Sequence, residues 1–415
     1  MTVAPDPQED PVSLTPAADP TLDDSAPRDG ADDSAEHGRW RDRKKALWLL
    51  GLVVPVLPFG AWELYQASGF GLLLWMGPLW ILAVIPLLDL LIGVNTLNPP
   101  EWATAQLEAD RFYRWCTFLF LPLQVTGLVF GVWVVARHHL NLFELLGWAS
   151  TVGSVGGIGI ANAHELGHKR EHLERWLSRI VLAQTAYGHF YVEHNRGHHS
   201  RVATPEDPAT SRLGQSFWAF LPRTVIGGIR SGWSLEASRL RREGHRPLDG
   251  RNRILQAWAM TLLLFGGLVA AFGVRVLPFL AVQAVFGFSL LEVVNYVEHY
   301  GLLRQKVANG RYERCRPEHS WNSDHLASNV FLYNLERHSD HHANPTRRFQ
   351  TLRTFEEAPQ LPSGYGGMIL LAYIPPLWRR VMDPRVVALY DGDLSRANIQ
   401  PRKRAQLERR YGRAV

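Results

Sequence analysis

The sequence predicts an all-α polytopic membrane protein with six transmembrane helices and a histidine-rich helical cap on the cytoplasmic side. Two observations predict this architecture. Long apolar runs alternate with strongly charged stretches along the 415 residues, a pattern typical of membrane proteins with large polar portions on one side. Nine histidines gather in four short clusters, either directly after an apolar run or in the polar stretches that follow.

The amino-terminal segment differs from the rest of the chain. Residues 1–36 are rich in Asp, Pro, Ala and Ser and lack apolar periodicity, so residues 1–40 are predicted to form a disordered acidic tail. Because the tail is acidic and the next apolar stretch is long, that stretch is expected to be a retained anchor rather than a signal peptide. Residues 41–415 are predicted to form a single six-span domain.

The predicted spans are apolar runs of about 20 residues. They cover residues 46–66, 70–94, 115–136, 142–163, 254–273 and 276–296. A topology with cap segments 164–253 and 297–415 in the cytoplasm leaves only Arg137 and Arg275 outside, of 44 basic residues. This positive-inside pattern predicts a multi-pass protein of the bacterial inner membrane whose histidine clusters face the cytoplasm.

Three further stretches need separate interpretation. Residues 217–233 and 368–378 are apolar, but the first is interrupted by charge and the second is too short to span, so both are expected to lie at the membrane surface. The small residues at 153–159 indicate close helix packing. They would also leave room for one wall of a lipid-facing cavity, and both interpretations stay open.

The histidine clusters predict a metal site. Spacings of three and four residues put imidazoles on one face of a helix, where neighbours can share an ion. Nine histidines exceed the needs of one ion and indicate two. The predicted ligands are His164, His168, His194, His198, His199, His299, His338, His341 and His342.

Carboxylates accompany the clusters, and ligating histidines need acceptors for their outer N–H groups. The acids predicted for this role are Glu165, Glu193, Glu298, Glu336 and Asp340; ordinary solvated charge is the alternative. Three histidines near the clusters could be outer partners or surface residues: His189, His319 and His325. The remaining histidines are expected to be unligated: His37, His138, His139, His172 and His245.

Residues His164 to His168 also match the HExxH pattern of zinc proteases, with Glu165 as the general base. A zinc protease needs three protein ligands and one open position, so this interpretation leaves most of the histidines without a role. A membrane protein that merely binds metal or haem would not explain their concentration on one side. Eight or nine imidazoles near an apolar cavity instead suit oxygen activation on an apolar substrate, for which iron is the fitting metal.

Only two cysteines occur, Cys116 and Cys315, and they form no CxxC pair. The chain therefore holds no rubredoxin-type iron site of its own. Any electrons that it uses are expected to come from a separate protein.

With these clusters, the chain resembles the membrane-bound non-haem di-iron alkane 1-monooxygenases. The resemblance extends over almost all of the chain after residue 40 and is most specific at Asn295–Gly301, which distinguishes alkane and xylene hydroxylases from fatty-acid desaturases. The matching stretches are 162–169, 188–199, 203–212, 295–306, 319–329 and 335–343, with 98–100 and 382–384.

The resemblance implies that the nine histidines hold two iron ions (Fe2+/Fe3+). It also implies O2-dependent terminal hydroxylation of n-alkanes, with electrons from rubredoxin and its flavoprotein reductase. A related hydroxylase acting on an alkyl aromatic or fatty acyl substrate is the alternative. No nucleic-acid partner is expected.

Two further expectations concern substrate and partner. By resemblance, Ile81 in the second span limits how deeply an alkane can enter; simple exposure to lipid is the alternative. Arginines on the cytoplasmic side are expected to attract an acidic rubredoxin, or else to serve topology and anionic lipids. They are Arg314, Arg316, Arg347, Arg348, Arg379 and Arg380.

Overall fold

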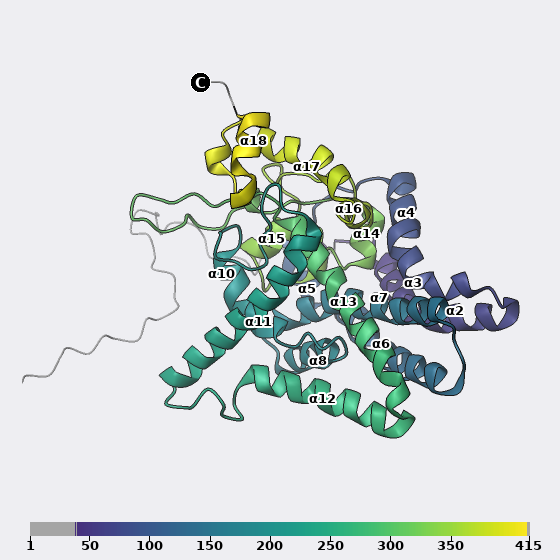
Figure 1. Ribbon diagram of the computed structural model, residues 1–415. Helices are drawn as coiled ribbons and strands as arrows, with labels where there is room; N and C mark the ends of the chain where they lie inside the picture. Colours follow the sequence, from purple (N-terminus) through teal and green to yellow (C-terminus); the bar gives the residue numbers. More distant parts are fainter. Residues whose placement is uncertain (1–37, 39, 413–415) are drawn as a thin grey trace, which may run out of the picture. The chain divides into compact units, whose positions relative to one another are not determined.

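The computed structural model describes Gly38 and residues 40–412. The predicted disordered tail therefore lies almost wholly outside the described residues. From Arg41 onward the chain forms one compact unit, and its described residues fold into helices and connecting loops, with isolated β-bridges but no strand (Figure 1).

The first two apolar segments form a hairpin. A 3-10 segment, Lys45–Leu52, continues into α2 (Val53–Ser68), which ends at Gly69 in the left-handed conformation (φ 69°). The return segment is broken into a 3-10 turn, α3 (Met76–Leu79), a π-helical turn at Trp80–Val84 and α4 (Ile85–Ile92). Such π turns are often found at functional sites.

The second hairpin consists of α6 (Arg111–Arg137) and α7 (Leu142–Gly167). A reciprocal cap starts α7: the Glu144 amide donates to Asn141 Oδ1 (3.0 Å), and the Asn141 amide donates to the Glu144 carboxylate (2.9 Å). Every residue of α7 from Gly147 to Gly167 is buried, so this helix is the centre of the bundle.

The third pair is α12 (Arg253–Phe272) and α13 (Leu277–Glu298). α13 lies along α7, and the small residues of α7 allow the close approach. A Cβ atom at Gly153 would lie 2.7 Å from the Gln283 carbonyl oxygen, and one at Gly157 would lie 2.8 Å from Leu290 Cβ. The packing interpretation of residues 153–159 therefore fits this interface.

Five segments of the described chain are long and apolar enough to cross a membrane. They are Lys45–Ser68, Gly71–Ile92, Arg111–Arg137, Arg253–Phe272 and Val274–Glu298. The chain is thus a helical membrane protein, but the fourth predicted span, 142–163, is not among these five. It does form a helix, α7, yet its Gly, Ser, Thr and Asn residues lower its hydropathy, and other parts of the protein surround it.

The remaining helices complete the unit. They are α5 (Thr104–Ala109), α8 (His172–Ala183), α9 (Phe190–Glu193), α10 (His199–Arg201), α11 (Phe217–Arg242), α14 (Leu326–Phe331), α15 (His338–Ala343), α16 (Tyr365–Ala372), α17 (Pro375–Leu389) and α18 (Arg404–Tyr411). The stretch predicted to lie at the membrane surface, 217–233, begins α11, where Trp218 and Ile226 are exposed. The stretch 368–378 is divided between α16 and α17.

Candidate metal centre

The nine predicted histidines come from four places in the fold. α7 supplies His164 and carries the chain into His168, and His299 directly follows α13. The segment from α9 to α10 supplies three more, and α15 supplies the last three. All nine meet at the same end of α7 and α13, so segments far apart in the sequence build one site.

The histidines divide into two groups. Within each group, one nitrogen of every residue lies within 4.8 Å of the others. The five-histidine group contains His164, His168, His194, His199 and His341. The four-histidine group contains His198, His299, His338 and His342.

A π-helical turn, His194–His198, explains why sequence spacing alone does not give this division. In an α-helix, His194 would share a face with His198. The wider π turn instead aligns His194 with His199, five residues on, and their Nε2 atoms are 3.1 Å apart. His198 is directed to the other group, where its Nε2 lies 3.3 Å from that of His342.

The short helix α15 is divided in a similar way. His338 and His342, four residues apart, belong to the four-histidine group, with their Nε2 atoms 2.9 Å apart. His341 faces the other group, and its Nε2 lies 3.2 Å from His199 Nε2. Neighbouring residues of one helical turn therefore serve different groups.

The nitrogen separations suit metal ligation. Two nitrogens that are each about 2.1 Å from one ion, at a right angle, are about 3.0 Å apart. The Nε2 atoms of His164 and His168 are also buried and have no hydrogen-bond partner among the described residues. An ion held by these lone pairs would satisfy nitrogens that are otherwise left unpaired.

Electrostatics keep most of these imidazoles neutral, as ligation requires. Burial and the neighbouring imidazoles hold the pKa of His194, His341 and His342 well below the ordinary value of 6.5. His198 is different: burial lowers its pKa, but the carboxylates of Asp207, Glu193 and Glu298 together raise it, and the net shift is upward.

Asp207 is a site residue that the sequence reasoning did not single out. Its carboxylate lies 2.9 Å from His198 Nδ1 and accepts a 2.6 Å hydrogen bond from the Thr210 hydroxyl. It is 1% exposed. An N–H donated to Asp207 leaves the His198 Nε2 lone pair directed into the four-histidine group. The signal available in the sequence was an Asp-Pro step with a Thr three residues after the Asp, inside the matching stretch 203–212.

Of the five predicted acids, Glu298 lies against a cluster histidine. Its Oε1 atom is 3.2 Å from His338 Nδ1 and accepts a 2.9 Å hydrogen bond from the Tyr365 hydroxyl. Tyr365, fully buried at the start of α16, also donates its backbone N–H to Glu336. The backbone carbonyl of His319 accepts from His299 Nδ1 (3.4 Å) and is another outer partner.

The other four acids bind cations or backbone amides. Glu165 pairs with Lys169 (2.9 Å) and accepts from the Phe349 amide. Glu193 pairs with Arg201 (2.9 Å), and Asp340 pairs with Arg347 (2.9 Å). An acid next to a ligand in a helix points about 100° away from it, so these carboxylates face outward. Glu165 is therefore not placed as the free general base of a protease.

The remaining histidines lie elsewhere in the unit. His189 is buried against Tyr187, the His319 ring pairs with Glu313, and His325 bonds to Ser323. The histidines expected to be unligated lie apart from both groups, except that His37 is outside the described residues.

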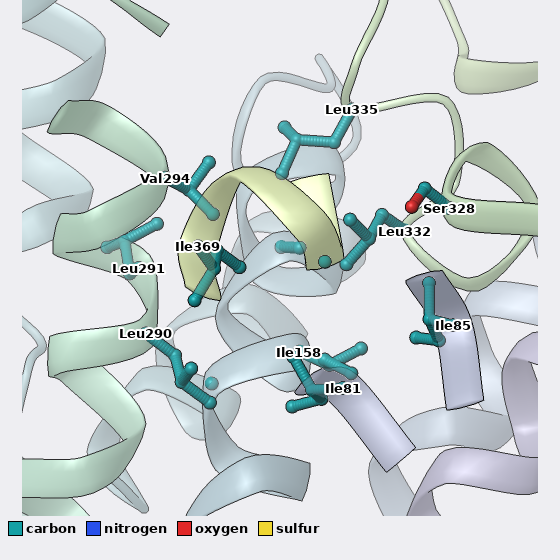
Figure 2. A pocket seen from close by; sticks show the side chains of 13 residues that line it. Ile81, Ile85, Ile158, Leu290, Leu291, Val294, Ser328, Leu332, Leu335 and Ile369 are labelled. Atoms are coloured by element: carbon teal, nitrogen blue, oxygen red, sulfur yellow. The ribbon is translucent and has the colours of Figure 1, made fainter. Parts of the chain in front are cut away.

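An apolar cavity adjoins the two histidine groups. Its wall includes Ile81, Ile85, Ile158, Leu290, Leu291, Val294, Leu332, Leu335 and Ile369, with Ser328 on one side (Figure 2). A smaller space, lined by His164, His194 and His338, shares four wall residues with it: Ala161, Leu291, Val294 and Leu335. Ile81 is 5% exposed, and Figure 2 shows its side chain in the cavity wall.

Comparison with known proteins agrees with this geometry. A family model described as fatty acid desaturase matches residues 140–371. Alkane 1-monooxygenase 1 of Alcanivorax borkumensis is 43% identical over 388 residues, which cover 93% of this chain and 95% of that protein. Alkane 1-monooxygenase of Pseudomonas putida is 45% identical over 377 residues, covering 89% and 92%. The xylene/toluene monooxygenase hydroxylase component of P. putida is 28% identical over 309 residues, covering 73% and 81%.

The chain is thus a histidine-rich helical membrane enzyme of the fatty acid desaturase class. Within that class it belongs to the alkane 1-monooxygenase family. The family expected from the histidine clusters and from residues 295–301 is confirmed.

Proposed function

We propose that this protein hydroxylates the terminal carbon of n-alkanes at a centre of two non-haem iron ions. The overall reaction consumes one alkane, one O2, two electrons and two protons, and it yields one 1-alkanol and one water. The observation that carries the proposal is the junction between two all-histidine groups and an apolar cavity.

Each group of histidines would hold one ion. Imidazole ligands suit iron as well as zinc and copper, and the family favours iron. The chemistry that the metal pair supplies when bound is the activation of O2 for attack on an unactivated C–H bond, which no side chain can perform. Asp207 would hold His198 in the tautomer that directs Nε2 toward the metal. Glu298 lies 3.2 Å from His338 Nδ1 but makes no hydrogen bond to it.

The cavity would select the substrate and the carbon that reacts. Its wall carries no charged side chain and few polar groups, so a hydrocarbon enters without desolvating charge. Four residues line both this cavity and the space beside the histidines: Ala161, Leu291, Val294 and Leu335. An extended chain would reach the metals with its end first, and this explains terminal attack.

The proposed topology has six spans, with α7 as the central one, in a bacterial inner membrane. Near-total burial of α7 makes its modest hydropathy compatible with this role, because protein rather than lipid surrounds it. The excess of Lys and Arg in the cap segments supports a cytoplasmic site.

Electrons would come from a separate rubredoxin, which its flavoprotein reductase reduces. Arg314 and Arg380 are exposed and available to an acidic partner, and Arg316 is exposed but paired with Glu313 (3.0 Å). Arg347 and Arg348 are engaged in ion pairs with Asp340 and Glu174, so they would contribute less.

A related substrate class is the second candidate, since the xylene/toluene monooxygenase component is also similar to this chain. Higher identity and longer coverage favour n-alkanes. The test is an assay of purified protein with rubredoxin, its reductase and O2, offered n-alkanes of increasing length and xylene in parallel, together with metal analysis. Two irons per chain and 1-alkanol product are expected; xylene turnover alone, or zinc with no oxygenated product, would contradict the proposal.

A further inference from the structure

A second cavity, with both apolar residues and glutamines in its wall, lies within the helix bundle, and the proposed alkane chemistry does not use it. Three glutamines from different segments line it: Gln124 of α6, Gln184 after α8 and Gln283 of α13. Gly156 of α7 and Pro58 of α2 also line it. Glutamine side chains are unusual in the apolar interior of a membrane bundle, because their amides need hydrogen-bond partners.

Two of these glutamines lack partners. Both carboxamide atoms of Gln124, and both of Gln184, are buried and make no hydrogen bond to any described residue. Each of the two residues is only 3% exposed. Burying an amide without a hydrogen bond is strongly unfavourable, so two unpaired carboxamides on residues that line one small space indicate that a hydrogen-bonding ligand fills it.

The third glutamine is already engaged. Gln283 Nε2 donates to the Gln184 carbonyl (2.9 Å) and to the Leu280 carbonyl (3.2 Å). It therefore ties the turn after α8 to α13. The Gln124 carboxamide packs directly on Gly159, where a Cβ atom would collide with it, so a glycine is required for Gln124 to hold this position.

The size of the space identifies the ligand. The cavity has a volume of about 10 Å³, which is room for about one water molecule. It is too small for an alkanol or a phosphate group. A single water can both donate to and accept from two amides.

We propose that this cavity binds one water molecule, which bridges the carboxamides of Gln124 and Gln184 within the membrane bundle. The bridge ties α6 to the turn at residues 184–187. That turn leads directly into the segment that carries His194, His198 and His199, so the water would anchor the ligand-bearing segment from its inner side. This inference rests on hydrogen-bond satisfaction and does not depend on the proposed reaction.

The direct test is cryo-electron microscopy of the intact protein in lipid nanodiscs, at a resolution that shows ordered water. One density peak is expected within hydrogen-bond distance of the carboxamides of both Gln124 and Gln184. An empty cavity, or a direct hydrogen bond between the two carboxamides, would overturn the proposal.

A thermal double-mutant cycle tests the bridge independently. Gln124→Leu and Gln184→Leu are each expected to lower Tm by about 2 °C or more. The double variant should lose less than the sum, because either substitution alone already removes the shared water. Strictly additive losses would overturn the bridge.

Two further variants keep the test informative. Gly159→Ala leaves both glutamines in place but displaces the Gln124 carboxamide, and it is expected to remove the water density and lower Tm. Gln66→Leu, at an exposed position of α2, is the matched control and should leave Tm unchanged. Retention of the water in Gly159→Ala, together with an unchanged Tm, would contradict the bridging geometry.

Discussion

His198 Nδ1 lies 2.9 Å from Asp207 Oδ2, and the hydroxyl of Thr210 donates a hydrogen bond to the same oxygen. Each ring of the four-histidine group must present one lone pair inward, so an acceptor for the outer N–H decides which nitrogen is free. Asp207 provides that acceptor from a buried loop. The pair accordingly links a segment without histidines to the metal centre.

Asp207→Asn is expected to weaken metal binding by the four-histidine group about 10–100-fold, as is typical when an outer partner of a ligating histidine is replaced. The reason is the loss of the negative charge that faces His198. Competition with a chelator, followed by iron analysis, measures the effect. Glu206→Gln is the matched control, because the Glu206 carboxylate bonds to Tyr312 and is exposed. Equal iron retention in both variants would contradict this role.

The division of the histidines predicts different results for two adjacent residues. His342→Ala leaves three ligands in its group, whereas His341→Ala leaves four in the other. We expect His342→Ala to lose one iron per chain at a lower chelator concentration than His341→Ala. Iron per chain across a chelator titration is the measurement. Identical titrations for the two variants would contradict the division into groups of five and four.

Ile81 predicts a limit on substrate length. Because its side chain lies in the cavity wall, Ile81→Trp should shorten the cavity and reduce hexadecane turnover relative to octane, roughly tenfold or more. Leu79→Trp is the control, since Leu79 is 41% exposed and should leave the length profile unchanged. If Ile81→Trp keeps the parent's ratio of octane to hexadecane turnover, the role of Ile81 is contradicted.

Exposed arginines predict a salt-dependent encounter with rubredoxin. Reversing the charge of Arg314 and Arg380 together should slow reduction of the metal centre at low ionic strength and flatten its salt dependence. Stopped-flow reduction across a salt series is the measurement. Arg246→Glu, in the exposed loop between α11 and α12, should behave like the parent protein. Reduction rates that do not vary with salt in the parent would exclude this docking surface.

Asp383 predicts a pH dependence of stability. Burial raises its pKa from 3.8 to about 6, although the Tyr300 hydroxyl donates to it (2.7 Å). Between pH 4 and 6 the folded protein then binds more protons than the unfolded chain, so this group makes stability fall as pH rises. The stability of Asp383→Asn relative to the parent should increase as pH rises through that window. At pH values above the window the gain should be at most about 3 kcal/mol. Thermal unfolding against pH measures the difference. The control Asp391→Asn, at an exposed position, should show no such gain. If the stability difference between Asp383→Asn and the parent is the same at all pH values, Asp383 does not cause the pH dependence.

Residue type and clustering along the sequence were enough to point to the nine histidines that the fold brings together. Their division into two groups could not be read from spacing. It depends on the π-helical turn at His194–His198, which moves the shared face from the fourth residue to the fifth. Asp207 lies near His198 because of a turn stabilised by Thr210, and no periodic pattern marks that turn.

The spans show a similar limit. Hydropathy identifies segments that face lipid, and five of the six predicted spans meet that criterion. α7 does not meet it, because its small and polar residues lower its hydropathy although the helix is buried in the protein. The wall of the apolar cavity also could not be predicted from hydropathy, because it is formed by residues of α4, α7, α13, α14 and α16, which are far apart in the sequence.

α16 has a consequence for redesign of the substrate range. Gly366 and Ile369 form part of the hydrocarbon cavity, while Tyr365, at the start of the same helix, donates its hydroxyl to the carboxylate beside His338. Reshaping the cavity through this helix would therefore also move an outer support of the metal centre. Libraries that vary Ile369 are best screened for iron content as well as product, whereas changes at Leu332 or Ile158 would leave that support in place.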